Sequence, residues 1–291
     1  MDRVREEISF AERYGPWALI AGGSEGIGRS FALQLAARGL DLILVARRAE
    51  ALEATAREIR ERFGIQVSTH AEDLTGPDLD RRLEVLVAGR DVGLLIYNAG
   101  AIHGAGLMHD RPLDDALTLT RLNCTGPLTL VHVLGGRMRT RGRGGIILVS
   151  SMSAFGGVGH TAVYAASKAF ERILAEGLWW ELGAFGVDVQ GLVAGATATP
   201  AMVRSNARFE RARSASGHPA LHEHGIQPMD PDDVAREALE HLGQGPICIA
   251  GEVNRAIAAQ MLHAPREEVI RRMSETSAQL YGLALPPKYR G

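Results

Sequence analysis

The stretch AGGSEGIG, residues 21–28, separates a short apolar run from a run that is rich in helix formers. The apolar run, 17–20, is too short for a helix and predicts a buried strand. The second run, 29–38, predicts a helix that ends at Gly39, a residue suited to a helix C-cap. A glycine-rich turn between strand and helix directs free N–H groups and the positive end of the helix dipole at one point, which suits a phosphate.

Three glycines of this turn have separate predicted tasks. Gly22 permits the tight turn, Gly26 lets a pyrophosphate approach the backbone, and Gly28 lets the helix pack closely on the strand. Their spacing differs from the common GxGxxG, so we interpret the stretch as a variant dinucleotide-binding fingerprint. A turn that binds nothing is the alternative interpretation.

Composition and charge argue against several classes of protein. The chain has 291 residues, is 46% hydrophobic and has a formal net charge of -2, which predicts one large domain without a basic surface for nucleic acid. No apolar stretch approaches the roughly 20 residues of a membrane span, and residues 1–14 lack the apolar core of a signal peptide. Cys124 and Cys248 lie too far apart in sequence to suggest a disulfide framework or a metal site. We expect a cytoplasmic protein without a metal.

Strand-like and helix-like runs alternate along the chain. Predicted strands cover 17–20, 41–46, 65–70, 92–97, 145–150, 187–193 and 246–250, and predicted helices cover 29–38, 50–62, 77–88, 112–139, 162–185, a segment opened by 230–233, and 266–281. Apolar strands separated by helices predict a parallel sheet covered on both faces. The predicted fold class is α/β, with a single doubly wound Rossmann-type domain.

The predicted domain covers residues 15–250 and contains a substrate lid at about 196–229. An N-terminal extension, 1–14, precedes it, and a C-terminal helical extension, 251–291, follows it. Because ligands of such sheets bind at the carboxyl ends of the strands, the residues that follow each strand are the candidates for chemistry.

Three strand ends carry candidate cofactor contacts. Arg47 and Arg48 follow the second strand, where an Arg can neutralise the 2′-phosphate of NADP; solvated charges at a helix start are the alternative. Asp73 follows the third strand and could accept a hydrogen bond from an adenine amino group or cap a turn. Asn98, Ala99 and Gly100 follow the fourth strand and are small enough for a cofactor to lie against their backbone.

The end of the fifth strand gives the most specific signal. Ser151 follows this strand, and Tyr164 and Lys168 come next, spaced to lie on one face of a helix. A free phenol has a pKa of about 10, and a nearby cation favours its phenolate form. Lys168 and Lys288 are the only lysines among 32 basic residues, so a compact, titratable ammonium at position 168 suggests a catalytic role. The alternatives are an ordinary helix surface for the pair and a strand-end cap for Ser151.

These residues together resemble the classical short-chain dehydrogenase/reductase family over about residues 15–250. Its glycine motif is matched by 21–28, its NAG motif by 98–100, its active-site Asn by Asn123, its catalytic Ser-Tyr-Lys by Ser151, Tyr164 and Lys168, and its Pro-Gly segment by 193–199. Residues 14–18 and 46–47 are more similar to the NADPH-using hydroxysteroid and 3-ketoacyl reductase branch. Ala21, Tyr97 and Ala194 depart from the usual Thr, Asn and Pro, but none lies in the catalytic group.

The resemblance implies a role for each catalytic residue. Tyr164 would exchange a proton with the substrate oxygen, and Ser151 would orient that oxygen. Lys168 would favour the phenolate of Tyr164 and hold the nicotinamide ribose, while Asn123 would fix a water that links Lys168 to solvent or, alternatively, only kink its helix. The implied cofactor-binding residues are Gly22, Ser24, Glu25, Gly26, Ile27, Gly28, Arg47, Arg48, Asp73, Leu74, Asn98, Ala99, Gly100, Tyr164, Lys168, Gly195, Thr197 and Thr199.

The expected function is NADP(H)-dependent reduction of a ketone or aldehyde to an alcohol, with a small-molecule substrate and no nucleic-acid or membrane partner. An NAD-dependent alcohol or hydroxysteroid dehydrogenase that works in the oxidative direction is one alternative. A non-enzymatic NADP-binding regulator is the other, because a fold alone does not determine function. The family resemblance also implies a homodimer or homotetramer, for which the apolar helix residues 174–182 are a candidate surface; burial in the protein's own core is the alternative.

Overall fold

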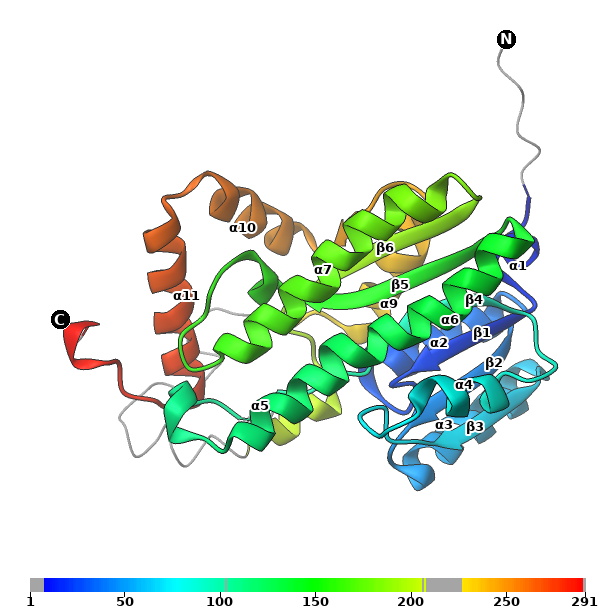
Figure 1. The fold of residues 1–291 in the computed structure, drawn as a ribbon, viewed down its shortest axis with the longest axis horizontal. Helices are drawn as coiled ribbons and strands as arrows, with labels where there is room; N and C mark the ends of the chain where they lie inside the picture. Colours follow the sequence, from blue (N-terminus) through cyan, green and yellow to red (C-terminus); the bar gives the residue numbers. More distant parts are fainter. Residues whose placement is uncertain (1–7, 103, 206, 208–226, 290–291) are drawn as a thin grey trace, which may run out of the picture.

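The computed structural model describes residues 8–102, 104–205, 207 and 227–289, and its centre is a seven-stranded parallel sheet in the order β3-β2-β1-β4-β5-β6-β7 (Figure 1). The strands are β1 (Trp17–Ala21), β2 (Asp41–Ala46), β3 (Val67–Ala71), β4 (Val92–Tyr97), β5 (Gly144–Ser151), β6 (Val187–Ala194) and β7 (Ile247–Ile249). The longer helices are α2 (Gly26–Ala37), α3 (Ala49–Phe63), α4 (Leu79–Leu86), α5 (Leu113–Thr120), α6 (Gly126–Arg141), α7 (Ala162–Gly183), α9 (Pro231–His241), α10 (Glu252–His263) and α11 (Arg266–Tyr281).

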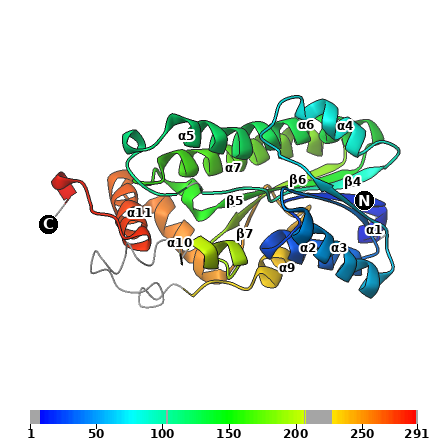
Figure 2. The same cartoon turned by 90° about the horizontal axis from the view of Figure 1, so that it is seen from below.

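The sheet lies between two layers of helices. Helices α4, α5, α6 and α7 cover one face, and α2, α3 and α9 cover the other (Figure 2). Every residue of β4 is buried, as the apolar strand pattern predicts for a sheet covered on both sides. The α/β, doubly wound fold class is therefore confirmed, together with the helices that follow residue 250.

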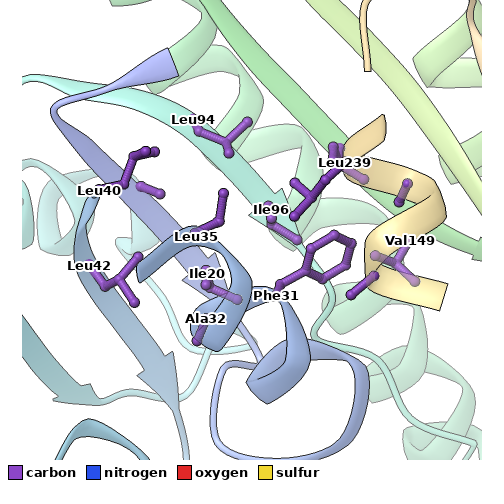
Figure 3. Close-up of a cluster of buried hydrophobic side chains, with 14 of the residues drawn as sticks. Ile20, Phe31, Ala32, Leu35, Leu40, Leu42, Leu94, Ile96, Val149 and Leu239 are labelled. Carbon is purple, nitrogen blue, oxygen red and sulfur yellow. The ribbon is translucent and has the colours of Figure 1, made fainter. Parts of the chain in front are cut away.

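A cluster of aliphatic and aromatic side chains holds α2 and α9 on the sheet (Figure 3). Phe31 and Leu35 of α2 face Ile20 and Ile96 of the sheet, and Leu239 of α9 closes the cluster from the side (Figure 3). Burying a side chain of this size contributes about 1.5–3 kcal/mol, so this cluster fixes the position of the helix that follows the glycine turn.

The strand order places a switch point between β1 and β4. The chain winds outward from β1 to β3 and then returns to β4 on the other side of β1. Ala21 at the end of β1 pairs with both Val45 of β2 and Tyr97 of β4. Ligands of doubly wound sheets bind in the crevice at such a point, so the fold directs attention to the turn after β1 and the loop after β4.

The helix predicted over 112–139 is interrupted, which corrects the sequence interpretation. Helix α5 ends at Thr120, a π-helical turn covers Arg121–Thr125, and α6 begins at Gly126. Pro127 lies in the first turn of α6 and has no N–H to donate to the preceding turn. Single π-helical turns frequently mark functional positions, and this one contains Asn123.

The N-terminal helix packs on the sheet, and the C-terminal helices lie at the far end of the molecule (Figure 1). Residues 8–14 include the short helix α1 (Phe10–Tyr14), whose Tyr14 is buried and donates a hydrogen bond to Asp188 at 2.8 Å. Helices α10 and α11 lie at the end of the molecule opposite α1 (Figure 1). Of the predicted lid, residues 206 and 208–226 lie outside the described residues. In the described part of the chain, no helix is both long and apolar enough to span a membrane.

Candidate active site

The glycine turn packs directly against the loop that follows β4. A Cβ atom at Gly22, whose φ is 84°, would lie 2.8 Å from the backbone N of Ala99. A Cβ atom at Gly28 would overlap the carbonyl oxygen of Gly22 and lie 2.7 Å from Nδ2 of Asn98, which itself donates to Gly22 O at 3.0 Å. The turn after β1 and residues 98–100 therefore form one continuous backbone surface.

The helix start at this surface fits the phosphates of a dinucleotide. Helix α2 begins at Gly26, three residues earlier than the sequence pattern predicts, and its N-cap residue Glu25 makes no side-chain hydrogen bond to the first turn. A Cβ atom at Gly26, whose φ is 54°, would lie 2.8 Å from Cγ2 of Thr199. The first-turn N–H groups thus keep no cap of their own, as an anion-binding helix start requires.

The charged residues predicted at the adenosine end differ in the partners that they contact. Arg48 forms an ion pair with Glu25 at 2.5 Å, and Arg204 also pairs with Glu25. Arg47 is exposed, and its charge contributes to lowering the pKa of Asp73, after the hydrogen bonds from Thr75. Asp73 Oδ1 accepts from the backbone N and the hydroxyl of Thr75 at 2.9 and 2.8 Å, which is the turn-cap geometry that the sequence left as an alternative.

The segment after β6 places Thr199 beside the turn, Gly195 beside α10 and Thr197 beside Met229. Thr199 lies next to Gly26, as described above. A Cβ atom at Gly195 would lie 2.5 Å from Oδ1 of Asn254 on α10, and buried Thr197 pairs through its backbone with Met229. The other predicted cofactor contacts, Ser24, Ile27 and Leu74, belong to the turn, to α2 and to the loop after β3.

Lys168 lies deep in the protein, against β5. Its side chain is buried, and Nζ donates to Val149 O and to Oε2 of Glu171, each at 2.8 Å. Burial alone would lower the pKa of Lys168, but the Glu171 carboxylate and the Tyr164 phenol outweigh burial and leave that pKa above its ordinary value. Lys168 therefore remains an ammonium in the neutral pH range.

Asn123 joins this group through the π-helical turn. Its fully buried Nδ2 donates to the hydroxyl of Ser167 at 2.9 Å, and that hydroxyl donates to the backbone oxygen of Tyr164 at 2.8 Å. A Cβ atom at Gly100 would lie 3.1 Å from Nζ of Lys168 and 3.6 Å from Oδ1 of Asn123, so the three residues meet at one place. Asn123 Oδ1 accepts no hydrogen bond from the described residues, which leaves an acceptor beside the ammonium.

Ser151 ends β5, and Tyr164 lies in the first turn of the helix that packs on this strand. Ser151 is the last residue of β5, and its Oγ accepts from the backbone N of Ser153 at 3.2 Å, which caps the short 3-10 helix Met152–Phe155. Tyr164 is half-buried in the first turn of α7, one helical turn before Lys168. Ser150, the neighbour of Ser151, donates to the backbone oxygen of Lys168 at 2.7 Å and so fastens α7 to β5.

The C-terminal helix α11 covers the loop between β5 and α7. Ser274 accepts a hydrogen bond from the backbone N of Gly159 at 2.8 Å, and a Cβ atom at Gly156 would lie 2.7 Å from Sδ of Met273. Burial, and next to it the phenol of Tyr164, raises the pKa of Tyr281 at the end of α11 to about 12. The extension thus forms one wall of the region around Tyr164.

The sequence interpretation missed two residues of this region. Glu171 could have been suspected, because an acidic residue three positions after Lys168 lies on the same face of the helix. Tyr281 had no comparable signal, since its approach to Tyr164 depends on how α11 folds back on the domain.

A parallel sheet with a glycine turn at its switch point, and a buried lysine one turn after a tyrosine, define the class of dinucleotide-dependent oxidoreductases. Residues 16–210 match the family model described as short chain dehydrogenase, and the chain belongs to this family. Its members are dehydrogenases and reductases that act on CH–OH and C=O groups with NAD(P). The family expected from the motifs is therefore confirmed.

Comparisons with individual proteins agree with this assignment. The chain is 32% identical over 268 residues to a 7beta-hydroxysteroid dehydrogenase of Clostridium sardiniense, an alignment that covers 92% of this chain and 98% of that protein. A solved structure of a 7beta-hydroxysteroid dehydrogenase, described for its stereoselectivity, gives a TM-score of 0.81 at 28% identity and covers 91% of this chain and 99% of that chain. A short-chain dehydrogenase from Sphingobium yanoikuyae in complex with NADPH gives a TM-score of 0.70 at 28% identity, covering 87% and 97%.

Proposed function

We propose that this protein is an NADPH-dependent carbonyl reductase that converts a bulky apolar ketone to an alcohol. The observation that carries the proposal is the buried Lys168 ammonium one helical turn from Tyr164, beside a backbone cradle that fits a dinucleotide. A protein that only senses NADP has no need of a phenol kept next to a buried cation. The catalytic group is Asn123, Ser151, Tyr164 and Lys168.

In this mechanism, the cofactor supplies the hydride and the chain supplies position and protons. Ser151 orients the carbonyl oxygen by a hydrogen bond, and Tyr164 donates its hydroxyl proton to that oxygen. The Lys168 ammonium stabilises the phenolate that remains. Asn123 holds a water beside Lys168, through which the proton is replaced. In the oxidative direction, the phenolate removes the proton of the alcohol.

The proposed cofactor preference rests on Arg47. Arg48 is already engaged by Glu25, whereas Arg47 is exposed after β2, where the 2′-phosphate of NADP would lie. The NADPH complex of the Sphingobium yanoikuyae relative supports this choice. Binding of NADPH and NADH should be compared by fluorescence in wild type and in Arg47→Ala. The control is Arg57→Ala, because Arg57 is an exposed arginine on the following helix, α3. Equal binding of the two cofactors by wild type would favour the NAD alternative.

The proposed substrate is a ketone on a large apolar skeleton, such as a steroid. The relatives named 7beta-hydroxysteroid dehydrogenase support this class. A panel of oxosteroids, aryl ketones and short aliphatic ketones should be tested with NADPH, and the matching alcohols with NADP+. Turnover of the bulky members and its loss in Tyr164→Phe are expected. Cofactor binding without turnover of any member would favour a regulator.

We propose that the protein forms a homodimer or homotetramer through the outer face of α5, α6 and α7. Apolar side chains are exposed there: Leu113, Leu117, Leu128, Ile173 and Trp180, the last 79% exposed. In contrast, Leu174, Leu178 and Leu182 of the predicted surface pack on the protein's own core. Light scattering should show that Trp180→Glu weakens the oligomer and that Val253→Glu, on the equally exposed surface of α10, does not. A monomeric wild type would refute this proposal.

The cysteines support a reducing, cytoplasmic location. Cys124 and Cys248 are both free. Burial raises the pKa of Cys248 to about 12 and also raises that of Cys124, so neither thiol readily forms the reactive thiolate. Fractionation of cells that produce the protein would test this location.

A further inference from the structure

Glu171 lies in a buried polar cluster and has no role in the mechanism above. Its side chain has no exposed surface, and its Oε2 accepts the hydrogen bond from Nζ of Lys168 at 2.8 Å. The residues are three positions apart on α7, so the helix itself sets their distance. This ion pair is buried, whereas Arg172 and Glu176, the next pair on the helix, are partly exposed.

The groups that face Glu171 come from three elements. Tyr97 approaches from β4, Cys124 from the π-helical turn, and Lys168 from α7. The Tyr97 hydroxyl is already committed, because it donates to Leu122 O at 2.6 Å. Glu171 Oε1 accepts no hydrogen bond from the described residues, so Lys168 is the group that compensates the buried carboxylate.

The hydrogen bonds of Lys168 leave one donor for the active site. An ammonium has three N–H bonds, and those to Val149 O and Glu171 use two. Gly100 has no side chain and leaves space beside Nζ, which Oδ1 of Asn123 also borders. With two N–H bonds fixed, the direction of the third is fixed as well.

We propose that Glu171 is a positioning residue, whose carboxylate holds the Lys168 ammonium against β5 and directs its third N–H bond toward the space bordered by Gly100 and Asn123. This inference rests on the proposed function, in which Lys168 acts beside Tyr164. Stability alone gives little reason to retain such a pair, because well-packed apolar side chains of similar size are often as stable as a buried ion pair.

The environment of Glu171 makes this hold dependent on pH. Burial raises the pKa of Glu171 to about 7, against the opposing effect of Lys168. Above this pH the carboxylate and the ammonium form an ion pair. Below it the acid becomes neutral, and the electrostatic attraction that fixes the ammonium is lost. Tyr97 and Cys124, which also face Glu171, have raised pKa values and stay neutral through this range.

The small number of lysines allows a direct measurement without cofactor or substrate. Labelling lysine with 13C at Cε gives signals from Lys168 and Lys288 alone, and Lys288→Arg assigns them. In wild type, the Lys168 signal should show a step near pH 7 as Glu171 titrates. In Glu171→Gln, this step should vanish. The pKa of Lys168 should be lower than in wild type by at least about one unit.

Cofactor binding provides the second readout. Glu171→Gln should weaken NADPH binding about tenfold at pH 8, equivalent to about one pKa unit of lost interaction. Glu171→Asp, which keeps the charge on a shorter side chain, should restore part of both effects. Glu176→Gln is the control, because Glu176 pairs with Arg172 on the same helix away from Lys168. It should leave the pH of the Lys168 step unchanged and the NADPH affinity within about twofold of wild type.

NADPH binding by Glu171→Gln within twofold of wild type would overturn the inference, and so would loss of the Lys168 proton at the same pH in Glu171→Gln and in wild type. A wild-type Lys168 signal without a step between pH 5 and 9, which can be measured even if a variant does not fold, would overturn the pH dependence. If both readouts behave as expected but wild type reduces no ketone, the positioning by Glu171 stands and the proposed reductase activity fails. If ketones are reduced but Glu171→Gln binds NADPH as wild type does, the positioning by Glu171 fails and the proposed reductase activity stands.

Discussion

The cofactor side and the catalytic side of the sheet are held together by different kinds of contact. On the cofactor side, backbone meets backbone: a Cβ atom at Gly28 would overlap Gly22 O. On the catalytic side, side chains meet: Lys168 is held by Glu171, and Met273 of α11 lies over Gly156. The structure of the cofactor side therefore depends on glycines that have no side chain, and that of the catalytic side depends on charge and on side-chain packing.

This difference predicts different responses to substitution. A clash with backbone can be relieved only if two elements separate, because the backbone has no alternative rotamers. A clash with the flexible end of a side chain is relieved when that side chain rotates. Changes on the cofactor side should therefore have large effects on cofactor binding, whereas changes on the catalytic side should be smaller, depend on pH, or be rescued by a second substitution.

Gly28→Ala should have the largest effect. The added methyl group would overlap Gly22 O and lie 2.7 Å from Asn98 Nδ2, which forces α2 away from β1. We expect a loss of roughly 3 kcal/mol in the free energy of unfolding and a decrease of at least about 100-fold in NADPH affinity. Urea unfolding and fluorescence titration measure the two quantities.

The control for this substitution is Gly177→Ala on α7. Among the described residues, nothing outside the adjoining helix backbone lies within 4 Å of a Cβ atom at Gly177, so alanine should stabilise the helix by up to about 1 kcal/mol and leave cofactor binding unchanged. Wild-type NADPH affinity in Gly28→Ala would show that the turn does not bind the cofactor.

The two sides also differ in how much of them could be predicted from sequence. Gly22 and Gly26 have positive φ values, and a Cβ atom at Gly28 would overlap Gly22 O within the same turn, so residue type within one short stretch records the need for these glycines. The spacing of Tyr164 and Lys168 is likewise local, because a single helix sets it. For this reason the turn, the strand ends and this pair were all predicted from the sequence, and the α/β fold is confirmed.

What could not be predicted depends on contacts between distant parts of the chain. The burial of Glu171 follows from the packing of α7 on β5 and β6, and the wall formed by Tyr281 follows from the course of α11. The π-helical turn at Asn123 was read as continuous helix, because helix propensity does not reveal where one extra residue is inserted. Side chains from separate elements determine these features, and periodicity within one element carries no record of them.

The buried carboxylate should make stability depend on pH. The pKa of Glu171 is raised from 4.5 to about 7 in the folded protein, so the neutral acid is the form that folding favours. Its contribution is fully present below pH 4.5 and is lost as the pH rises through about 7. Relative to Glu171→Gln, wild type should lose roughly 3 kcal/mol of unfolding free energy between pH 4.5 and 7.5. Urea unfolding at several pH values measures this, and parallel curves for the two proteins would contradict it.

Tyr97 and Gly126 should behave as a coupled pair. A Cβ atom at Gly126 would overlap the Tyr97 hydroxyl and lie 3.1 Å from Cζ, so Gly126→Ala should cost about 2 kcal/mol. Tyr97→Phe alone should cost about 1 kcal/mol, because Leu122 O loses its donor. The double variant should lose less unfolding free energy than the two single variants together, since phenylalanine removes the overlapping oxygen. Simple additivity in unfolding experiments would show that the two groups do not touch.

Gly156→Ala should have the smallest effect of the four and tests the catalytic side directly. Its backbone is extended, which any residue can adopt, and the added methyl group would lie 2.7 Å from Sδ of Met273, the end of a flexible side chain. We expect a loss below about 1 kcal/mol in unfolding free energy, unchanged NADPH affinity, and a KM for ketone that rises because α11 shifts. Adding Met273→Ala should restore the KM. If Gly156→Ala instead weakened NADPH binding as much as Gly28→Ala, the two sides of the sheet would not be independent.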